Sequence, residues 1–163
     1  MVRRVGNPGY VLAYHGCDRL IGEQVLAGEK GLTPSTNTYD WLGHGIYFWE
    51  NDWKRAEEWV IERKRHPNSK IQEPFVIGAI IDLGVNLSLM RREDIEFVRN
   101  GFKALTKLHE ISGAPLPQNQ GGQDRFRRDL DCGVIQIAHA IRKAKGEAEF
   151  ESVRGMFYEG EEV

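Results

Sequence analysis

The stretch Trp41–Asn51, which reads WLGHGIYFWEN, constrains the fold of this chain more than any other segment. Gly43 and Gly45 carry no Cβ, so their backbone can take a positive φ angle or approach a bound molecule closely. The run Ile46–Trp49 that follows is β-branched and aromatic, which favours a strand. Such a strand, entered from a glycine turn, can present the ring of Tyr47 as a flat wall for a planar ligand. The alternative is a buried strand with a tight turn before it.

Three further motifs flank this stretch in a fixed order: His15-Gly16-Cys17, Gly31-Leu32 and Arg55-Ala56. With the GHGIYF run they resemble the ADP-ribosyltransferase fold of the histidine–tyrosine–glutamate type, the type of diphtheria toxin and the poly(ADP-ribose) polymerases. In that family a strand ends in His-Gly and a short helix ends in Gly-Leu. A Gly-x-Gly-(Ile/Phe)-Tyr-Phe strand then leads into a helix that carries an alanine. The resemblance covers residues 10–59.

The bulk properties are those of a globular protein. The chain has 163 residues, of which 40% are hydrophobic and 28% charged, with a net charge of −2. This length suits one domain, and we expect a single ADP-ribosyltransferase-like domain over residues 1–163. The charge balance does not attract nucleic acid or anionic membranes to the whole molecule, although local patches are compatible with it.

The sequence also bears on location. Its longest apolar run, Phe75–Ile81, is too short to span a bilayer. The basic start is followed by Gly6, Asn7 and Pro8, where a signal peptide needs apolar residues. Cys17 and Cys132 fit neither a disulfide framework nor a metal-ligand spacing. We therefore expect a reduced, cytoplasmic protein with no metal site and no membrane partner.

The periodicity predicts mixed helices and strands without strict alternation, which indicates an α+β fold. The resemblance specifies it as an ADP-ribosyltransferase-like split antiparallel β core with flanking helices. The segment 75–83 is apolar on both faces and is therefore expected to be a central strand. The other expected strands are 9–14, 46–49 and 149–158; the expected helices run from Asp18 to Leu26, from Asn51 or Asp52 to His66, over 95–108 and over 127–145; long loops are expected over 33–40 and 112–123.

The resemblance assigns roles to individual residues. It implies that His15 hydrogen-bonds the ribose of NAD and that the backbone of Gly16 holds the nicotinamide amide. Tyr47 matches the tyrosine that stacks on the nicotinamide ring, and Gly45 belongs to the same cofactor-binding segment. Many polymerase-type members carry a second stacking tyrosine where this chain has Glu58. Trp59, one residue on, is the candidate to replace it, or it belongs to the core.

The third catalytic residue is where the chain departs from the family. A carboxylate near the ribose stabilises the positive charge that develops there as nicotinamide leaves. In the family this residue lies on a late strand, which we cannot place before Val163. Glu159, in the tail Glu159-Gly160-Glu161-Glu162, is the candidate, and a solvated acidic end is the alternative. We therefore expect the 163-residue form to lack the last strand or strands and to transfer ADP-ribose poorly, and a longer natural chain to be active.

Several residues have competing interpretations. Arg55 replaces the serine that many polymerase-type members have before the helix alanine. His44 is either a contact for a phosphate or target, or a turn residue facing solvent. His15 and Cys17 share one strand face and could form a nucleophile pair or half of a metal site, which no further cluster supports. Two basic groups could bind nucleic acid or be solvated faces: Arg63-Lys64-Arg65 and Arg125-Arg127-Arg128.

Together these features predict an NAD-dependent ADP-ribosyltransferase, a toxin-like or effector-like glycosyl transferase that uses NAD as a substrate. It would move ADP-ribose to a macromolecule, protein or nucleic acid, and release nicotinamide. An antitoxin or inhibitor protein is a further expected partner. Two alternatives remain open: a catalytically incomplete domain that acts by binding through its NAD pocket, and an enzyme like RNA 2′-phosphotransferase, to which the Tyr47 strand is less suited.

Overall fold

A computed structural model describes residues 9–121 and 127–156 of the chain. The described residues form two compact units. The first consists of residues 9–34 and 46–83, and the second of residues 35–45 and 84–156. Both contain helices and strands, so the predicted α+β class is confirmed. The prediction of one domain over residues 1–163 stays a prediction.

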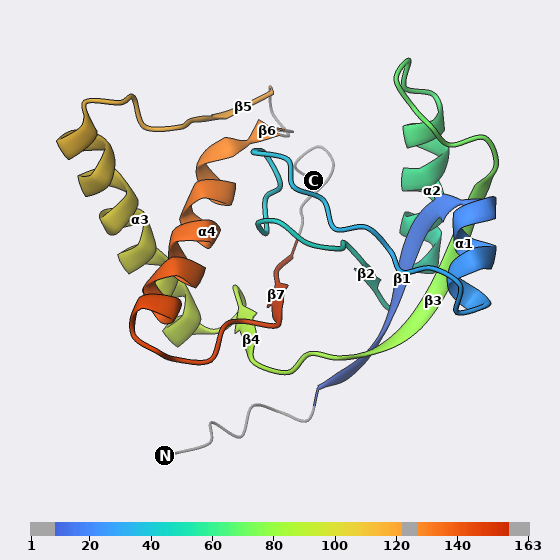
Figure 1. Ribbon diagram of the computed structural model, residues 1–163, viewed down its shortest axis with the longest axis horizontal. Helices are drawn as coiled ribbons and strands as arrows, with labels where there is room; N and C mark the ends of the chain where they lie inside the picture. Colours follow the sequence, from blue (N-terminus) through green and yellow to red (C-terminus); the bar gives the residue numbers. More distant parts are fainter. Residues whose placement is uncertain (1–8, 122–126, 157–163) are drawn as a thin grey trace, which may run out of the picture. The chain divides into compact units, whose positions relative to one another are not determined.

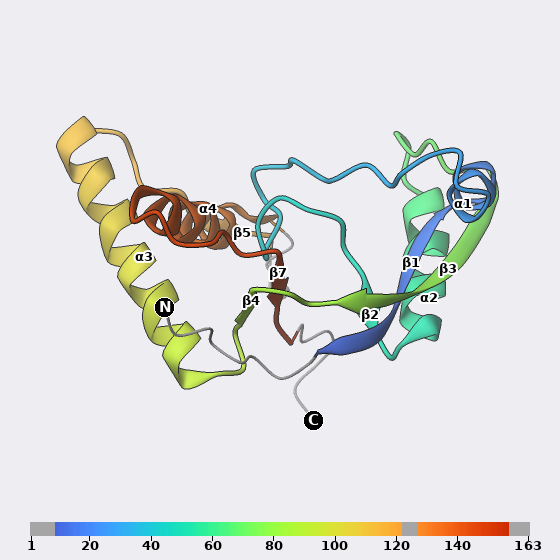
Figure 2. The ribbon, with the colours of Figure 1, turned by 60° about the horizontal axis from the view of Figure 1, so that its bottom comes forward.

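The first unit is built on a three-stranded antiparallel sheet in the order β2-β1-β3. Figures 1 and 2 show β1 (Tyr10–Asp18) and β3 (Pro74–Asp82) side by side along their length. These two strands pair over nine residues each, from Tyr10 opposite Asp82 to Asp18 opposite Pro74. β1 therefore extends four residues beyond the predicted end at Tyr14, and it carries His15 and Gly16 within the sheet.

Two strand predictions were wrong. The predicted central strand, β3, lies at the edge of the sheet, and β1 is central. Helices cover β3 only near its start, where one helix packs on Phe75 and a second lies beside Val76, whereas Ile80 further along the strand is 76% exposed. The predicted strand 46–49 is reduced to β2 (Trp49–Glu50), since Ile46, Tyr47 and Phe48 lie outside the ladder.

Two helices cover opposite faces of this sheet. Helix α1 (Arg19–Leu26) begins after Asp18, the predicted start of this helix, and the side chain of Asp18 caps it by accepting from the N–H of Leu20. A Cβ on Gly22 of α1 would meet the ring of Phe75 and the sulfur of Cys17, so α1 packs on the face that Cys17 shares. Helix α2 (Trp53–Lys64) is capped by Asp52 and packs through Ala56 and Val60, both fully buried, on the other face.

The second unit is a helical pair beside a small parallel sheet. Strand β4 (Asn86–Ser88) pairs in parallel with β7 (Ser152–Arg154), which lies inside the predicted strand 149–158. Helices α3 (Arg92–Ser112) and α4 (Asp129–Ala144) match the predicted helices over 95–108 and 127–145. Their packing buries Leu87, Leu105, Val134, Ile135 and Ala138. The predicted loop after α3 contains a short strand, β5 (Asn119–Gln120), paired with β6 (Arg127–Arg128).

Residues 35–45 join this second unit. The N–H groups of Ser35 and Gly45 donate to each other's carbonyl oxygens at 2.7 and 3.0 Å. Gly43 has φ +82°, which a residue with a side chain rarely adopts, and a Cβ there would meet the side chain of Ile135 at 2.7 Å. The glycine turn predicted from the sequence is therefore present. None of the described helices is both long enough and apolar enough to cross a membrane.

Candidate functional site

The first unit brings His15 and Tyr47 together. Nδ1 of His15 lies 2.7 Å from the main-chain oxygen of Tyr47. A carbonyl oxygen can only accept, so Nδ1 carries the proton and donates it to Tyr47. The ring of Phe48 stands beside the imidazole, with the two ring centroids 5.4 Å apart. Residues 32 positions apart in the sequence are thus joined by a side chain to main chain contact.

The protonation state of His15 follows from its surroundings. Burial lowers the pKa of His15 below its ordinary 6.5, and the hydrogen bond to Tyr47 opposes this shift in part. The imidazole is therefore neutral at pH 7. With Nδ1 as the donor to Tyr47, Nε2 has a lone pair and is a hydrogen-bond acceptor. This is the protonation state that can receive a hydrogen bond from a ribose hydroxyl.

Gly16 presents its backbone to the side of β1 that faces β2. The N–H of Asn51 donates to the carbonyl of Leu12 on that side. Because backbone groups alternate along a strand, Tyr14 and Gly16 point to the same side as Leu12. The pairing with β2 ends at Tyr14 opposite Trp49, so within the described residues the N–H and C=O of Gly16 lie beyond the β2 ladder. The N–H of Gly16 is a donor and its C=O an acceptor, a pair that complements the oxygen and the NH₂ group of a primary carboxamide.

Close packing on α2 also requires a glycine at position 16. A Cβ on Gly16 would lie 2.7 Å from the carbonyl oxygen of Ala56 and 2.8 Å from Cβ of Val60. The helix therefore approaches β1 beside the His15-Gly16 pair. Trp59 precedes Val60 on α2 and is 37% exposed, so it is not one of the buried core residues of this helix.

Arg55, the residue that precedes Ala56 on α2, has a structural role. The guanidinium of Arg55 lies 4.9 Å from the centroid of the Trp49 ring, and Nη2 lies 3.6 Å from Oε2 of Glu62. Arg55, in the first turn of α2, thus contacts Trp49 of β2 and Glu62 of its own helix. The side chain thus stabilises the packing of these two elements on each other.

Other predicted site residues are placed as follows. Gly45 and His44 belong to the second unit, where Gly45 bridges to Ser35 and His44 is exposed. Glu58 is an exposed residue of α2. Glu159 lies outside the described residues, and so does Arg125 of the second basic group.

The cysteine interpretation is disfavoured. Cys17 is 8% exposed and shares a face of β1 with His15, as predicted. Burial and the charge of Asp18 raise the pKa of its thiol, which disfavours the thiolate that a nucleophile or metal ligand needs. In the part of the chain that the structure describes, no group of His, Cys, Asp and Glu side chains could hold a metal ion.

The second basic group is largely engaged in local contacts. Arg127 stacks on Tyr39 at 5.1 Å and pairs with Asp129 at 3.2 Å. Arg128 pairs with Asp131 at 3.4 Å. Arg63, Lys64 and Arg65 at the end of α2 are exposed. These contacts favour a structural role for Arg127 and Arg128 over a nucleic-acid interface.

Sequence reasoning missed the polar cluster at the start of α4. Oδ1 of Asn119 accepts from the N–H groups of Leu130 and Asp131, at 3.1 and 3.3 Å. Its Nδ2 donates to the Asp131 carboxylate at 2.8 Å. Asn119 thus caps a helix that begins ten residues later. The acidic residues of the first turn were a sequence signal for the helix start, but nothing marked Asn119 as the cap.

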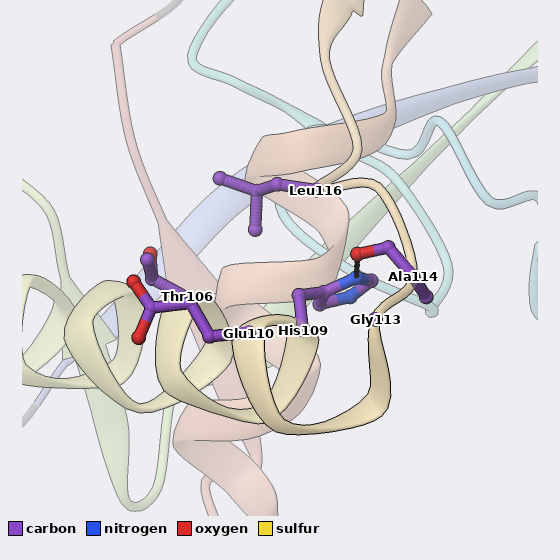
Figure 3. A pocket seen from close by; sticks show the side chains of 6 residues that line it. All are labelled: Thr106, His109, Glu110, Gly113, Ala114 and Leu116. Carbon is purple, nitrogen blue, oxygen red and sulfur yellow. Dashed lines mark hydrogen bonds between the residues drawn. The ribbon is translucent and has the colours of Figure 1, made fainter.

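A shallow hollow of about 300 Å³, which the sequence did not predict, lies at the C-terminal end of α3. Figure 3 shows the side chains that line it. His109 lies on its wall with Nδ1 3.3 Å from the carbonyl oxygen of Ala114. Gly113, with φ +70°, ends the helix and lets the chain turn back over it. The hollow is a product of this helix end, and its wall adds only Thr106, Glu110 and Leu116.

Comparison with known proteins leaves the family open. No protein-family model matches the chain, and no solved structure matches it. A segment of 66 residues, 40% of the chain, is 33% identical to an uncharacterized protein of Methanocaldococcus jannaschii. This segment covers 30% of that protein, so the chain spans less than a third of the length of the relative that it matches.

Proposed function

We propose that the chain binds NAD between His15, Gly16 and Tyr47 and acts as an ADP-ribosyltransferase. The observation that carries this proposal is the 2.7 Å contact from Nδ1 of His15 to the backbone of Tyr47. It joins the two motifs whose order along the sequence suggested the family. It also fixes the tautomer of His15 that can accept from a hydroxyl.

The chemistry of each group fits a part of the cofactor. The carboxamide of nicotinamide has a donor and an acceptor, which complement the C=O and N–H of Gly16. Nε2 of His15 would accept from a ribose hydroxyl, and the aromatic ring of Tyr47 would stack on the pyridinium. These three contacts would hold the bond between ribose and nicotinamide in one place, which favours its cleavage by orientation.

The reaction would proceed by loss of nicotinamide from the ribose carbon and attack there by a nucleophile of the acceptor. Positive charge develops on the ribose as the bond breaks, so a carboxylate must lie near it. Glu159 remains the proposed carboxylate. The acceptor would be a protein or a nucleic acid, and NAD would be consumed as a substrate.

The first experiment measures binding and cleavage on the same preparation. Titration calorimetry with NAD, and with NADH as a matched control, tests the pocket. NADH carries an uncharged dihydropyridine ring, so stacking of the pyridinium on Tyr47 predicts weaker binding of NADH. Chromatography then follows the release of nicotinamide from NAD over time.

Each outcome bears on one proposal. Binding with release supports the transferase. Binding without release, in a chain that is folded by circular dichroism, agrees with the weak transfer expected of the 163-residue form. Absence of release from a longer natural chain as well supports the alternative of a domain that acts through its NAD pocket alone. Absence of NAD binding contradicts both.

A further inference from the structure

β3 has a neighbouring strand on one side only. On its other side, no strand of the described chain pairs with its backbone N–H and C=O groups. β3 is an edge strand of nine residues in the sheet order β2-β1-β3. The N–H of Leu83 donates to the carbonyl of Gly9 across the β1–β3 pair. By alternation, Ile77 and Ala79 also point to β1, and Val76, Gly78 and Ile80 point outward. Exposed edges of this length are templates for pairing with another strand.

The side chains along this edge are apolar and include a strongly exposed one. Ile80 is 76% exposed, on the same face as Val76 because the two are four residues apart on a strand. Gly78 between them is also exposed and has no side chain to obstruct a neighbour. Tyr10, on the neighbouring β1, is 70% exposed on this face as well.

A groove lies at the other end of the same face. Its volume is about 320 Å³, and it runs between α2 and the start of β3. Pro74, Phe75 and Val76 of β3 form one wall, and α2 forms the other with Trp53, Glu57, Val60 and Ile61; Arg19 of α1 also lines the groove. Trp53 and Ile61 are 50% and 38% exposed, so the apolar part of the α2 wall is open to solvent.

We propose that β3 pairs with β3 of a second copy of this chain, antiparallel and centred on Gly78. In that register Gly78 lies opposite Gly78 of the partner, and Val76 lies opposite Ile80 of the partner. Val76, Gly78 and Ile80 would each exchange their N–H and C=O with the other strand, which continues the sheet across the two-fold axis.

We favour a second copy of the chain as the partner of β3, because the edge carries both an exposed side chain and the groove that can receive it. Ile80 lies two residues after Gly78, and Val76 on the wall of the groove lies two residues before it. Residues directly opposite each other in an antiparallel pair share a face. A two-fold axis at Gly78 therefore places the exposed Ile80 of each copy beside the groove of the other. Pro74 has no N–H, which limits the pairing to the stretch that this register uses.

The wild-type chain supplies the first test. Sedimentation velocity over a concentration series should show a reversible monomer–dimer equilibrium. Hydrogen exchange should report increasing protection of the Val76, Gly78 and Ile80 amides as concentration rises. The amides of Ile77 and Ala79, already bonded to β1, are internal controls and should not change. A chain that stays monomeric, or a dimer that leaves these three amides unprotected, overturns the proposal.

Substitutions locate the contact between copies. Ile80→Lys and Ile61→Asp should each abolish the dimer, because each places a charge in the apolar contact. Mixing the two variants should restore a dimer, since one contact becomes a Lys–Asp pair and the other remains native. Tyr10→Lys makes the same charge change on the same face but away from the edge, and should leave the dimer intact.

The mixture keeps this test informative even if one variant is less stable. Circular dichroism first establishes that both variants are folded. If one variant is not folded, hydrogen exchange on the wild-type chain tests the proposal instead. Dimers in both single variants would place the interface elsewhere and overturn the proposal. If both variants are folded but their mixture forms no dimer, the proposal is likewise overturned. None of these measurements needs NAD, so their outcome is independent of the proposed transferase.

Discussion

The imidazole of His15 takes the place of a ladder bond to Tyr47. β1 and β2 pair only at Ala13 opposite Glu50 and at Tyr14 opposite Trp49. Two residues before Trp49, the carbonyl of Tyr47 accepts from a side chain of β1 at 2.7 Å. The strand pairing therefore stops beside Gly16, whose backbone lies past its end. One contact thus both orients the histidine and defines the boundary of the candidate site.

Removal of this contact should destabilise the chain. His15→Ala leaves the half-buried carbonyl of Tyr47 without its donor, which costs about 1–3 kcal/mol. His15→Gln retains a side-chain donor and should lose less. Urea unfolding measures both, with His44→Ala at an exposed position as the control. Equal stability of wild type and His15→Ala would mean that solvent replaces the donor without cost.

The buried His15 should also make stability depend on pH. Its pKa in the folded chain lies below the ordinary 6.5, so the unfolded chain takes up the proton first as pH falls. The contribution of His15 to the free energy of unfolding should therefore be constant above about pH 7 and decrease as pH falls from 6.5 through the lower pKa of the folded state. Burial also lowers the pKa of His139, so this residue likewise decreases the free energy of unfolding as pH falls.

Variants separate these two contributions. In His15→Gln the slope of stability against pH should become shallower and retain only the His139 part. His139→Gln should remove the other part. Urea unfolding at a series of pH values between 5 and 8 measures the slope, and an unchanged slope in both variants would contradict the assignment.

The stacking role of Tyr47 predicts a loss of NAD affinity on truncation. Tyr47→Ala should weaken binding by about 1–3 kcal/mol, by analogy with the loss of an aromatic that stacks on a base. Tyr47→Phe keeps the ring and should bind as the wild type does. Calorimetry compares the three proteins after their folding is verified. Equal affinity in a folded Tyr47→Ala variant would make Tyr47 a structural residue.

Gly16 should tolerate no side chain. Gly16→Ala places a methyl group 2.7 Å from the Ala56 carbonyl, against backbone that cannot rotate away. Overpacking of this kind costs about 1–3 kcal/mol. Gly31→Ala is the matched control, because no atom lies within 4 Å of a Cβ at that glycine. Thermal unfolding that ranks the two variants equally would contradict the close packing of α2 on β1.

Local signals in the sequence predicted the helices well. Asp18 and Asp52 cap α1 and α2 as expected, because an N-cap is a short-range interaction that residues one to three positions away determine. The amphipathic periodicity located α3 and α4 but did not decide which of their residues are buried. Leu105 and Val134 are buried, whereas three residues of the same α3 stripe are 41%, 39% and 52% exposed: Ile95, Phe102 and Leu108.

The strands were predicted less well, because their positions depend on partners far along the chain. The apolar run of β3 indicated a central strand, yet Ile80 is 76% exposed at the sheet edge. β-propensity predicted a strand over 46–49. It contains no information about the side chain of His15, which donates a hydrogen bond to the carbonyl of Tyr47. The convergence of His15 and Tyr47 was predicted only through the family resemblance.

The polar cluster at the start of α4 gives the last prediction. Asn119 accepts from the N–H groups of Leu130 and Asp131, and the N-cap residue Arg128 makes no side-chain cap bond of its own. Asn119→Ala should therefore act as the loss of an N-cap does and destabilise the chain by about 0.5–2 kcal/mol. The neighbouring exposed Gln120→Ala is the control. Amide hydrogen exchange should show the loss at the N–H groups of Leu130 and Asp131 first, because Asn119 is their direct acceptor. A variant with native stability, and with native protection at these two amides, would mean that water or another side chain caps α4 equally well.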